Sequence, residues 1–503
     1  MEAINKKKTI QDLPEETIEN ILSHLSSKSL KAAALTCKRW NEISSKMGWK
    51  LKLNFENERG IEEPWVEVLL KSNRNFKSIQ LYDYAEMRNN RSNRLMKFFE
   101  KHGGNVQNLV MWSGELHHFI IFCDVLSTMP NLKKISFIDL STQGRFTKNF
   151  FEDHLPNLQK LETLYLYASD IELLKYFKKT QINSLEIIDY MDANEQENVK
   201  ILLDFLIYQK NLKCFDLVPF PPNFFSEQLK ISIATENFTF KLKELTLDDS
   251  YEEIGAINYY NMLKFFEFHS DTIERLELGC SLPDFLFECI FSKFKRLASL
   301  TFNRPMICPN DEPPLYERFE INTNIKVLNF PSFALSGEKE DVLKEIFKHV
   351  PNVEMLRTNG SMNLHEVLNV LTRLKHLVLY GPSQKLHQIK SQSLQSITID
   401  KLEFTPDWEE IAANNPNVHT IEIKNALENS DIVKLLTNVK LRHLYLPMIE
   451  VDSSVCKALR EHTEDMKSLR IHKASFVNCQ ENLADVKCLR FHENESRDSY
   501  DQA

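Results

Sequence analysis

Glycine is scarce in this 503-residue sequence, which contains only 11 glycines. Loops that cradle a phosphate need glycine wherever the backbone must approach the anion closely. The one adjacent pair is Gly103-Gly104, and no P-loop or dinucleotide-binding pattern is present. The sequence therefore argues against a nucleotide-driven enzyme.

Long apolar runs and an excess of basic residues are also lacking. No apolar run approaches the roughly 18 residues that a membrane-spanning helix needs, and no secretory signal opens the sequence. The formal net charge of −9 argues against a general nucleic-acid binder, which needs an excess of lysine and arginine on one face. We therefore expect no membrane partner, no nucleic-acid partner, and a cytoplasmic or nuclear location, or both.

The nine cysteines include no Cys-x-x-Cys pair. Because their number is odd and no secretory signal is present, we expect reduced thiols in a reducing compartment. His443, His472, Cys488 and His492 could approach one another on adjacent strands, but their spacing is not that of a zinc site. We therefore expect no metal and no other cofactor.

A short apolar pattern recurs along most of the chain. The pattern apolar-x-x-apolar-x-apolar occurs 17 times between Phe76 and Phe491, with starts about 26 residues apart, as in Leu242, Leu245 and Leu247. Alternate burial predicts one short strand per copy, and no copy can bury its apolar face alone. The chain is also longer than one compact core usually fills, so we expect either several domains or one elongated array.

The segments between these copies have helical periodicity. Leu202, Phe205 and Leu206 lie on one apolar face of a 3.6-residue period. Several helices are expected to end at a Pro-Asn pair such as Pro416-Asn417, because proline cannot continue a helix. The spacing and the pattern resemble a leucine-rich-repeat array. The expected fold class is an α/β solenoid of curved strand–helix units.

One feature departs from that resemblance. Leucine-rich repeats usually place asparagine or cysteine at the ninth position of the unit, and here Asn494 alone fits. A serine hydroxyl can satisfy turn backbone groups in part. Serine occupies the ninth position in four copies, at Ser169, Ser250, Ser281 and Ser361.

Residues 10–50 do not follow the repeat and predict three short helices. Pro14 suits the first position of a helix, and Glu15 and Glu16 favour the positive end of its dipole. Ser29 can cap a second helix, and Trp40 lies on a third. Such a small module has too little core to be comfortable alone, so we expect it to lean on a partner.

The order of residues in this module resembles an F-box. It begins with Leu13-Pro14 and ends with Cys37-Lys38-Arg39-Trp40, with apolar residues between them at Ile18, Ile21, Leu25, Leu30 and Leu35. Two positions depart from the usual pattern, Thr17 in place of an aliphatic residue and Ser29 in place of aspartate. We expect an F-box at 10–55, about 17 leucine-rich repeats at 60–492, and disordered tails at 1–9 and 493–503.

This order of domains resembles the F-box/leucine-rich-repeat class of SCF-type ubiquitin-ligase adaptors. The resemblance implies that the F-box docks on a Skp-family linker, which joins it to a cullin–RING ligase core, while the repeats hold a protein substrate. Such an adaptor has no catalytic residue, because it works by raising the effective concentration of a substrate lysine near the ubiquitin thioester. The implied outcome is ubiquitylation of the substrate and its degradation by the proteasome.

The same resemblance implies a set of linker-facing or F-box core residues. Leu13 and Pro14 precede the packed stripe of the first helix and are the stronger interface candidates. Ile18 and Leu25 are equally explained as residues that hold the three helices together. The full set comprises Leu13, Pro14, Ile18, Ile21, Leu25, Leu30, Cys37 and Trp40.

The alternation along the strands indicates a substrate surface. Positions three, five and seven of each copy point away from the buried leucines, onto the inner face of the curve. These positions comprise Tyr165, Tyr167, Glu186, Asp216, Glu244, Thr246, Asp248, Glu277, His443, Tyr445, Arg470, His472 and Arg490. We hypothesise a two-signed face that reads a partner's charge pattern, and ordinary solvated strand polarity is the alternative.

Two other functions remain open on the sequence alone. One is an interaction scaffold that binds a Skp-family protein through its F-box without driving ubiquitylation. The other is an enzyme within the array, because a fold by itself does not exclude activity. The sequence contains no convincing active-site motif, which favours the adaptor.

Overall fold

The computed structural model describes most of the chain, in two compact units. The first unit comprises Met1–Leu242 and Glu253–Ile257, and the second comprises Lys243–Glu252 and Asn258–Ala503. The described residues are 13–25, 27–54, 64–82, 92–115, 119–141, 156–189, 195–234, 238–248, 257–280, 282–303, 319–330, 346–359, 368, 370–383, 386–402, 406–462, 465–476 and 489–491. The expected tails at 1–9 and 493–503 lie outside these residues.

The first unit begins with three helices and continues as alternating strands and helices. Its helices are α1 (Glu15–Ser23), α2 (Ser27–Ala34), α3 (Lys38–Lys46), α4 (Pro64–Lys71), α5 (Ser92–His102), α6 (Phe119–Ser127), α7 (Leu174–Phe177), α8 (Glu195–Tyr208) and α9 (Glu227–Ala234). Its strands are β1 (Gly48–Asn54), β2 (Asn75–Tyr82), β3 (Asn108–Glu115), β4 (Lys134–Ser141), β5 (Thr163–Tyr167), β6 (Ser184–Ile188) and β7 (Cys214–Val218). From β1 to β7, consecutive strands pair in parallel.

The second unit continues the same alternation. Its strands are β8 (Glu244–Leu247), β9 (Arg275–Leu278), β10 (Ser299–Phe302), β11 (Val327–Phe330), β12 (Met355–Asn359), β13 (His376–Ser383), β14 (Ser396–Leu402), β15 (Thr420–Ile423), β16 (His443–Val451), β17 (Ser468–Phe476) and β18 (Leu489–Phe491). Its described helices include α10 (Tyr259–His269), α11 (Asp284–Lys293), α14 (Trp408–Asn414), α15 (Asn429–Asn438) and α16 (Ser453–His462). Consecutive strands again pair in parallel.

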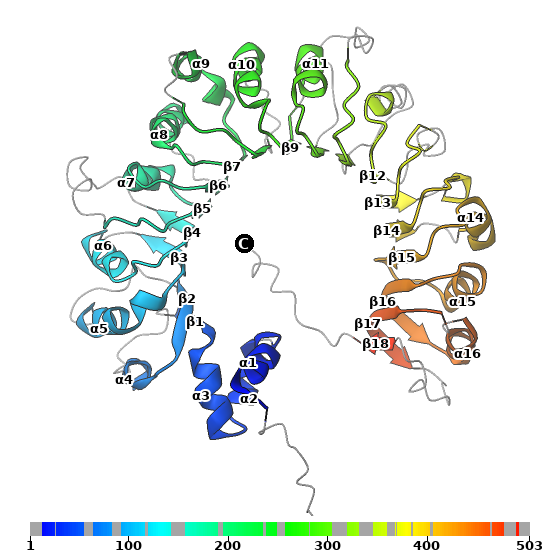
Figure 1. Cartoon of the computed structure of the whole chain (residues 1–503), viewed down its shortest axis with the longest axis horizontal. Coiled ribbons are helices and arrows are strands. Elements are labelled where there is room, and N and C mark those ends of the chain that lie inside the picture. The colour runs from blue at the N-terminus through cyan, green and yellow to red at the C-terminus, as the bar shows by residue number, and fades with distance from the viewer. Residues whose placement is uncertain are drawn as a thin grey trace, which may run out of the picture. The chain divides into compact units, whose positions relative to one another are not determined.

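Within each unit the strands lie on one side and the helices on the other (Figure 1). All 17 copies of the apolar pattern fall on strands, one on each of β2 to β18. The second apolar residues of neighbouring copies are paired across the strands and buried, as for Leu245, Leu276 and Leu300. Each such side chain contributes roughly 1.5–3 kcal/mol when it is fully buried. The predicted α/β solenoid is confirmed in each unit.

The sequence pattern missed β1. Trp49 pairs with Phe76 and Leu51 with Ile79, and the register shifts between residues 49 and 50. This bulge places one residue fewer between the apolar positions of β1 than between those of β2, so the six-residue pattern does not match. The sheet starts at Gly48, inside the 10–55 range expected for the helical module, and the domain boundaries stay a prediction.

A residue with left-handed backbone lies near the end of, or directly after, three strands of the first unit. Asp139, Ala168 and Asp189 have positive φ angles of 55°, 45° and 50°, and each is the eighth residue of its repeat. Ser169 follows directly and is buried, with its hydroxyl donating to the Tyr167 carbonyl at 2.8 Å. The same hydroxyl accepts the Leu140 amide at 3.0 Å. A ninth-position serine thus satisfies turn backbone groups, as expected, while Ser250, Ser281, Ser361 and Asn494 lie outside the described residues.

Side-chain amides of asparagine at the ends of the helices link successive repeats. Asn417, in the expected Pro-Asn pair, donates to the Gln392 carbonyl at 2.7 Å, and Asn131 and Asn352 make the same kind of bond. Asn415 is buried beneath this layer and donates to the Ile389 carbonyl at 2.8 Å. The Pro-Asn pairs therefore join neighbouring repeats in addition to ending helices.

Helix α16 shows how a local cap is built. The Asp452 carboxylate accepts the Ser454 hydroxyl at 2.6 Å and the Val455 amide at 2.9 Å. These hydrogen bonds, that from Ser454 foremost, lower the pKa of Asp452 to about 2. An ionised carboxylate at the start of a helix is also favoured by the helix dipole.

The expected reduced thiols are found at five positions. Cys37, Cys123, Cys214, Cys280 and Cys289 carry reduced thiols that form no disulfide. Cys456 on α16 differs, because its sulfur is disulfide-bonded, and its partner lies outside the described residues. Spacing alone did not indicate this pairing.

Candidate protein-binding surfaces

The three N-terminal helices share a small core. Helix α3 packs against both α1 and α2, and four of their apolar side chains are buried, namely Ile18, Leu22, Leu30 and Ile43. Ile18 and Leu30, which the sequence assigned to either the linker or the core, are therefore core residues. Pro14 was expected at the first helical position, but it lies at the N-cap, one residue before α1 begins at Glu15, and makes no side-chain capping bond. Helix α2 begins at Ser27, so Ser29 lies within it and is not its cap.

Apolar side chains also remain on the surface of this module. Pro14 is exposed, Ile21 is 38% exposed, and Leu35 is 86% exposed. The remaining members of the predicted set are half-buried, namely Leu13, Leu25, Cys37 and Trp40. Exposed apolar side chains on so small a module are candidates for contact with a partner.

Two hydrogen bonds fix the residues around the start of α3. The Arg39 guanidinium donates to the Leu13 carbonyl at 2.7 Å, which holds the start of α3 beside the start of α1. The Cys37 sulfur accepts the Trp40 amide at 3.5 Å and so caps α3. Cys37 thus has a capping role, in addition to the role of small hydrophobe that its type predicts.

Leu35 is the residue that sequence reasoning missed. It belongs to the matched pattern, but it was not counted among the candidate interface residues. Leu30, Ala33 and Ala34 form the buried stripe of α2 at positions i, i+3 and i+4, and Leu35 lies off that stripe. A helical-wheel comparison would have separated it from the core.

The module is joined firmly to the first strand of its unit. The Trp49 indole on β1 donates to the Ser44 carbonyl on α3 at 2.7 Å. The Arg74 guanidinium lies over the same ring, 4.2 Å from its centroid, and Asn75 donates to the Lys46 carbonyl at 3.4 Å. Because α3 continues into β1 through Met47 alone, no flexible linker separates the module from the strands.

The open face of the first unit carries one row of predicted substrate residues. Tyr165, Glu186 and Asp216 are in register across β5, β6 and β7, and Tyr167 lies two residues further along β5. Glu186, Asp216 and Tyr167 are half-buried, whereas the Tyr165 ring is buried, contrary to its expected exposure. Burial, and secondarily Glu186, raises the pKa of Tyr165 to about 12.

The acidic residues of the second unit form two pairings. Glu244 and Arg275 are in register, with 3.5 Å between their charged groups, and both side chains are half exposed. The Asn303 amide donates to Asp248 at 3.0 Å and to Glu277 at 2.7 Å. Two carboxylates and one amide therefore form a connected polar site near the start of the unit.

Gly279 leaves room for this site. A Cβ atom there would lie 1.8 Å from a carboxylate oxygen of Asp248, so any side chain would displace the carboxylate. Thr246, the other predicted residue of this region, lies in register with Glu277 on the same face. Placement on an open face agrees with the predicted role of these residues, and that role stays a prediction.

The basic and aromatic end of the predicted face lies on β16 to β18. Tyr445 and Arg470 are in register, and the guanidinium lies 5.2 Å from the centre of the tyrosine ring. His443 is half-buried on the same face of β16. His472 and Arg490 lie on β17 and β18, and their side chains are outside the described part of the structure.

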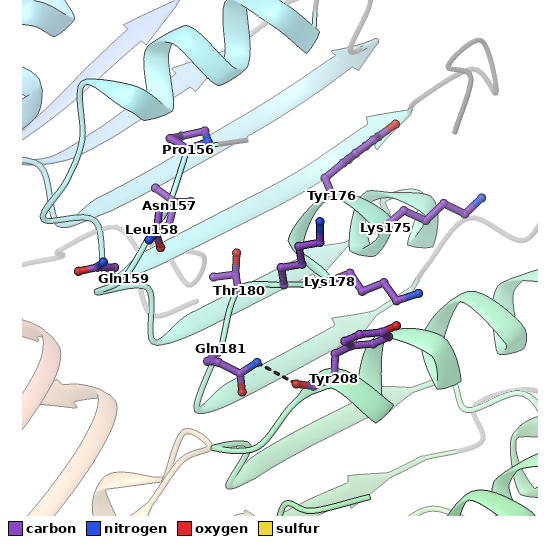
Figure 2. Close-up of a pocket in the computed structure, with 11 residues that line it drawn as sticks. Pro156, Asn157, Leu158, Gln159, Lys175, Tyr176, Lys178, Thr180, Gln181 and Tyr208 are labelled. Atoms are coloured by element: carbon purple, nitrogen blue, oxygen red, sulfur yellow. Dashed lines mark hydrogen bonds between the residues drawn. The ribbon is translucent and has the colours of Figure 1, made fainter. Parts of the chain in front are cut away.

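A depression of 580 Å³ opens on the first unit, between the turn at residues 156–159, α7 and the end of α8 (Figure 2). The Lys178 ammonium lies over the Tyr208 ring, 4.5 Å from its centre, and Lys175 bonds Glu172 at 2.9 Å. The Gln181 amide donates to the Tyr208 carbonyl at 2.8 Å. Both of these lysines are already engaged within the protein.

The comparison with known families decides what the three-helix module is. The family model of F-box-like domains matches residues 10–50. The N-terminal module is an F-box-like domain. The apolar surface described above therefore belongs to an F-box-like domain that is docked on a leucine-rich-repeat array, an architecture typical of non-catalytic interaction adaptors.

The chain is similar, at low sequence identity, to several solved structures, of which three are given. A TLR13–ssRNA13 complex is 12% identical, with 89% of this chain and 72% of that chain covered and a TM-score of 0.42. The leucine-rich-repeat-containing protein LegL7 from Legionella pneumophila is 14% identical, with 65% and 89% covered and a TM-score of 0.32. The Toll–Spatzle complex of Drosophila is 13% identical, with 76% and 48% covered and a TM-score of 0.30. No curated protein sequence matches the chain.

The part of the chain that the structure describes holds neither a metal-binding cluster nor a membrane-spanning helix. Among those residues, no group of three or more histidine, cysteine, aspartate or glutamate side chains could hold a metal ion. Cys488 and His492 of the sequence-level zinc candidate lie outside them. None of the helices that the structure describes combines the length and hydrophobicity needed to cross a bilayer.

Proposed function

We propose that this protein is the substrate-recognition subunit of an SCF-type E3 ubiquitin ligase. The F-box-like domain binds a Skp-family linker and through it the cullin–RING ligase core. The open strand face binds a protein substrate, which is ubiquitylated and then degraded by the proteasome. The chain itself is a non-catalytic adaptor that acts in the cytoplasm, the nucleus or both.

The observation that carries the proposal is the apolar surface of the F-box-like domain. A leucine that is 86% exposed contributes almost nothing to folding, so Leu35 is explained by burial in a complex. The firm attachment of the domain through Trp49 supports the same function. A rigid joint holds a bound substrate at a defined position relative to the ligase core, which is what catalysis by proximity requires.

Linker binding tests this proposal. Leu35→Asp should weaken binding of a purified Skp-family protein by about 30-fold or more, since a charged group would be buried in an apolar contact. Leu13→Ala combined with Pro14→Ala should have a similar effect. The matched control is Val68→Asp on α4, where an aliphatic side chain is 67% exposed but lies outside the F-box-like domain.

The thermal stability of both aspartate variants should stay within about 0.5 kcal/mol of the wild type, because the replaced side chains are exposed. Equal linker binding by wild type and Leu35→Asp, or equal losses in Leu35→Asp and Val68→Asp, would contradict the proposal.

A further inference from the structure

A second depression lies within the second unit, at the edge where strands β12 to β16 begin. Its volume is 550 Å³. One row of its lining consists of the residues that stand immediately before each of these strands, Glu354, Lys375, Gln395, His419 and Arg442. Neither the sequence analysis nor the comparisons assign a role to this edge.

Backbone hydrogen bonds build this row. The amides of Lys375 and His376 donate to the Glu354 carbonyl at 2.8 and 2.9 Å, and equivalent pairs join each later member of the row to the one before it. At the far end, Arg442 and His443 donate to the His419 carbonyl at 2.7 and 3.0 Å. The side chains of the row are therefore held at regular interstrand spacings of about 4.8 Å.

The depression is cationic. Arg373, Lys375 and Arg442 line it together with His419, and Glu354 is its one acidic lining residue. The Glu354 carboxylate is already paired, at 2.8 Å with Lys375 and at 3.6 Å with Lys326. This site lies on a chain whose formal net charge is −9, so its charge is not a general property of the surface.

The two arginines differ from the lysines of the first depression. Lys175 and Lys178 there are engaged with Glu172 and Tyr208 (Figure 2). Arg373 and Arg442 are exposed, and within the described residues neither guanidinium has a hydrogen bond or an ion pair. A guanidinium presents a planar set of donors that suits carboxylates, so two such groups are available to a ligand.

The local field agrees with this arrangement. The pKa of His419 is lowered, first by burial and then by Arg442, with smaller effects of His443 and His376. Its ring nitrogen Nδ1 lies 3.0 Å from the Thr420 hydroxyl. Arg442 thus makes the potential at the ring more positive, as an anion site requires.

Spacing selects the kind of anion. The segment that carries Arg373 and Lys375 leads into β13, and Arg442 leads into β16, so three interstrand steps of about 14 Å in total separate them. A single phosphate or carboxylate cannot contact both ends. In an extended chain, residues i and i+4 lie about 13 Å apart, which matches this separation.

We propose that this depression binds an extended acidic segment of a protein partner, with one carboxylate at Arg373 and another at Arg442. Aspartate or glutamate at position i faces Arg373, and a second acidic residue at i+4 faces Arg442. The side-chain amides of Gln392 and Gln395 lie between these ends and can bond the backbone of the segment. The inference rests on the proposed adaptor function in that the segment belongs to its protein partner.

A structural role for the same cations is the rival explanation. The row follows the carboxyl ends of helices such as α14, where positive side chains complement the helix dipole. That role predicts lower stability when the arginines are removed, and no ligand. The two explanations therefore predict different results for peptide binding and for the thermal stability of the arginine variants.

The test uses the full chain and a labelled Gly/Ser peptide that carries aspartate at i, i+2 and i+4. Binding is followed by fluorescence anisotropy at physiological salt. Arg373→Ala and Arg442→Ala should each weaken binding by about tenfold or more, and the double variant should abolish it. Lys434→Ala is the matched control, because Lys434 is an exposed cation on α15, and it should change binding less than twofold.

Further arms identify the ligand chemistry. The same peptide with asparagine in place of aspartate should not bind, and a peptide with one phosphoserine and inorganic phosphate should both bind more weakly. Tighter binding of either phosphate probe would overturn the assignment to spaced carboxylates. Absence of binding, an equal effect of Lys434→Ala, or a fall in Tm of the arginine variants without peptide binding would also overturn it. No ligase component is present, so failure of linker binding is a separate result.

Discussion

Asn415 offers the sharpest test of how neighbouring repeats are held together. Its amide is 1% exposed and donates to the Ile389 carbonyl at 2.8 Å and to the Ile411 carbonyl at 2.9 Å. Its oxygen accepts the Ser391 amide at 3.0 Å. In Asn415→Ala, the Ile389 carbonyl loses this partner inside the protein. The Ile411 carbonyl still accepts the backbone amide of residue 415, and the Ser391 amide still donates to the Asn414 carbonyl.

One buried carbonyl without its partner, together with two groups that each lose one of two hydrogen bonds, costs about 2–4 kcal/mol. In a unit of this size, that corresponds to a fall in Tm of roughly 5–15 °C. Thermal unfolding followed by circular dichroism measures it, and amide exchange on β14 localises it. Asn417→Ala is the control, because its amide bonds the Gln392 carbonyl at 2.7 Å at an exposed position where water can replace it. Equal costs of the two substitutions would refute the reasoning.

Three further predictions concern other parts of the chain. Trp49→Ala should speed amide exchange in α3 and β1 by tenfold or more, with exchange in β15 unchanged, because the indole joins the F-box-like domain to β1. Asp452 has a depressed pKa of about 2, so its capping contribution to stability should be present above about pH 4 and lost as the pH falls through 2. Amide hydrogen exchange in α16 measures this loss, and Asp452→Asn should remove its pH dependence. Charge reversal of three carboxylates should abolish capture of the cognate partner in pull-downs, and unchanged capture would refute the two-signed face; the positions are Glu244, Asp248 and Glu277.

The strands were predictable because burial at every second residue repeats with each unit. The leucines of β8, Leu245 and Leu247, illustrate this, since each must be buried against the next unit whatever the loops do. Strand β1 escaped the pattern because a bulge changes the spacing after Trp49. A local shift of register leaves no trace in an apolar count, although Trp49 and Leu53 are both buried.

The F-box-like domain was predictable from its ordered pattern, but the split between core and surface was not complete. Ile18 and Ile21 are both isoleucines on one helix, yet the first is buried and the second is 38% exposed. The cationic row was not predictable at all. Arg373 and Arg442 are far apart in sequence, and the parallel pairing of β13 to β16 is what brings them to one edge.

The most direct test of the adaptor function follows the proteins that the wild-type chain captures. Their abundance and ubiquitylation should be compared by quantitative proteomics in cells with the chain removed, restored, or restored as Leu13→Ala plus Pro14→Ala. The proposal predicts that captured proteins accumulate on removal, fall again with the wild type, and stay high with the variant. Captured proteins whose levels and ubiquitylation do not change would contradict it, and would instead identify a Skp-binding scaffold.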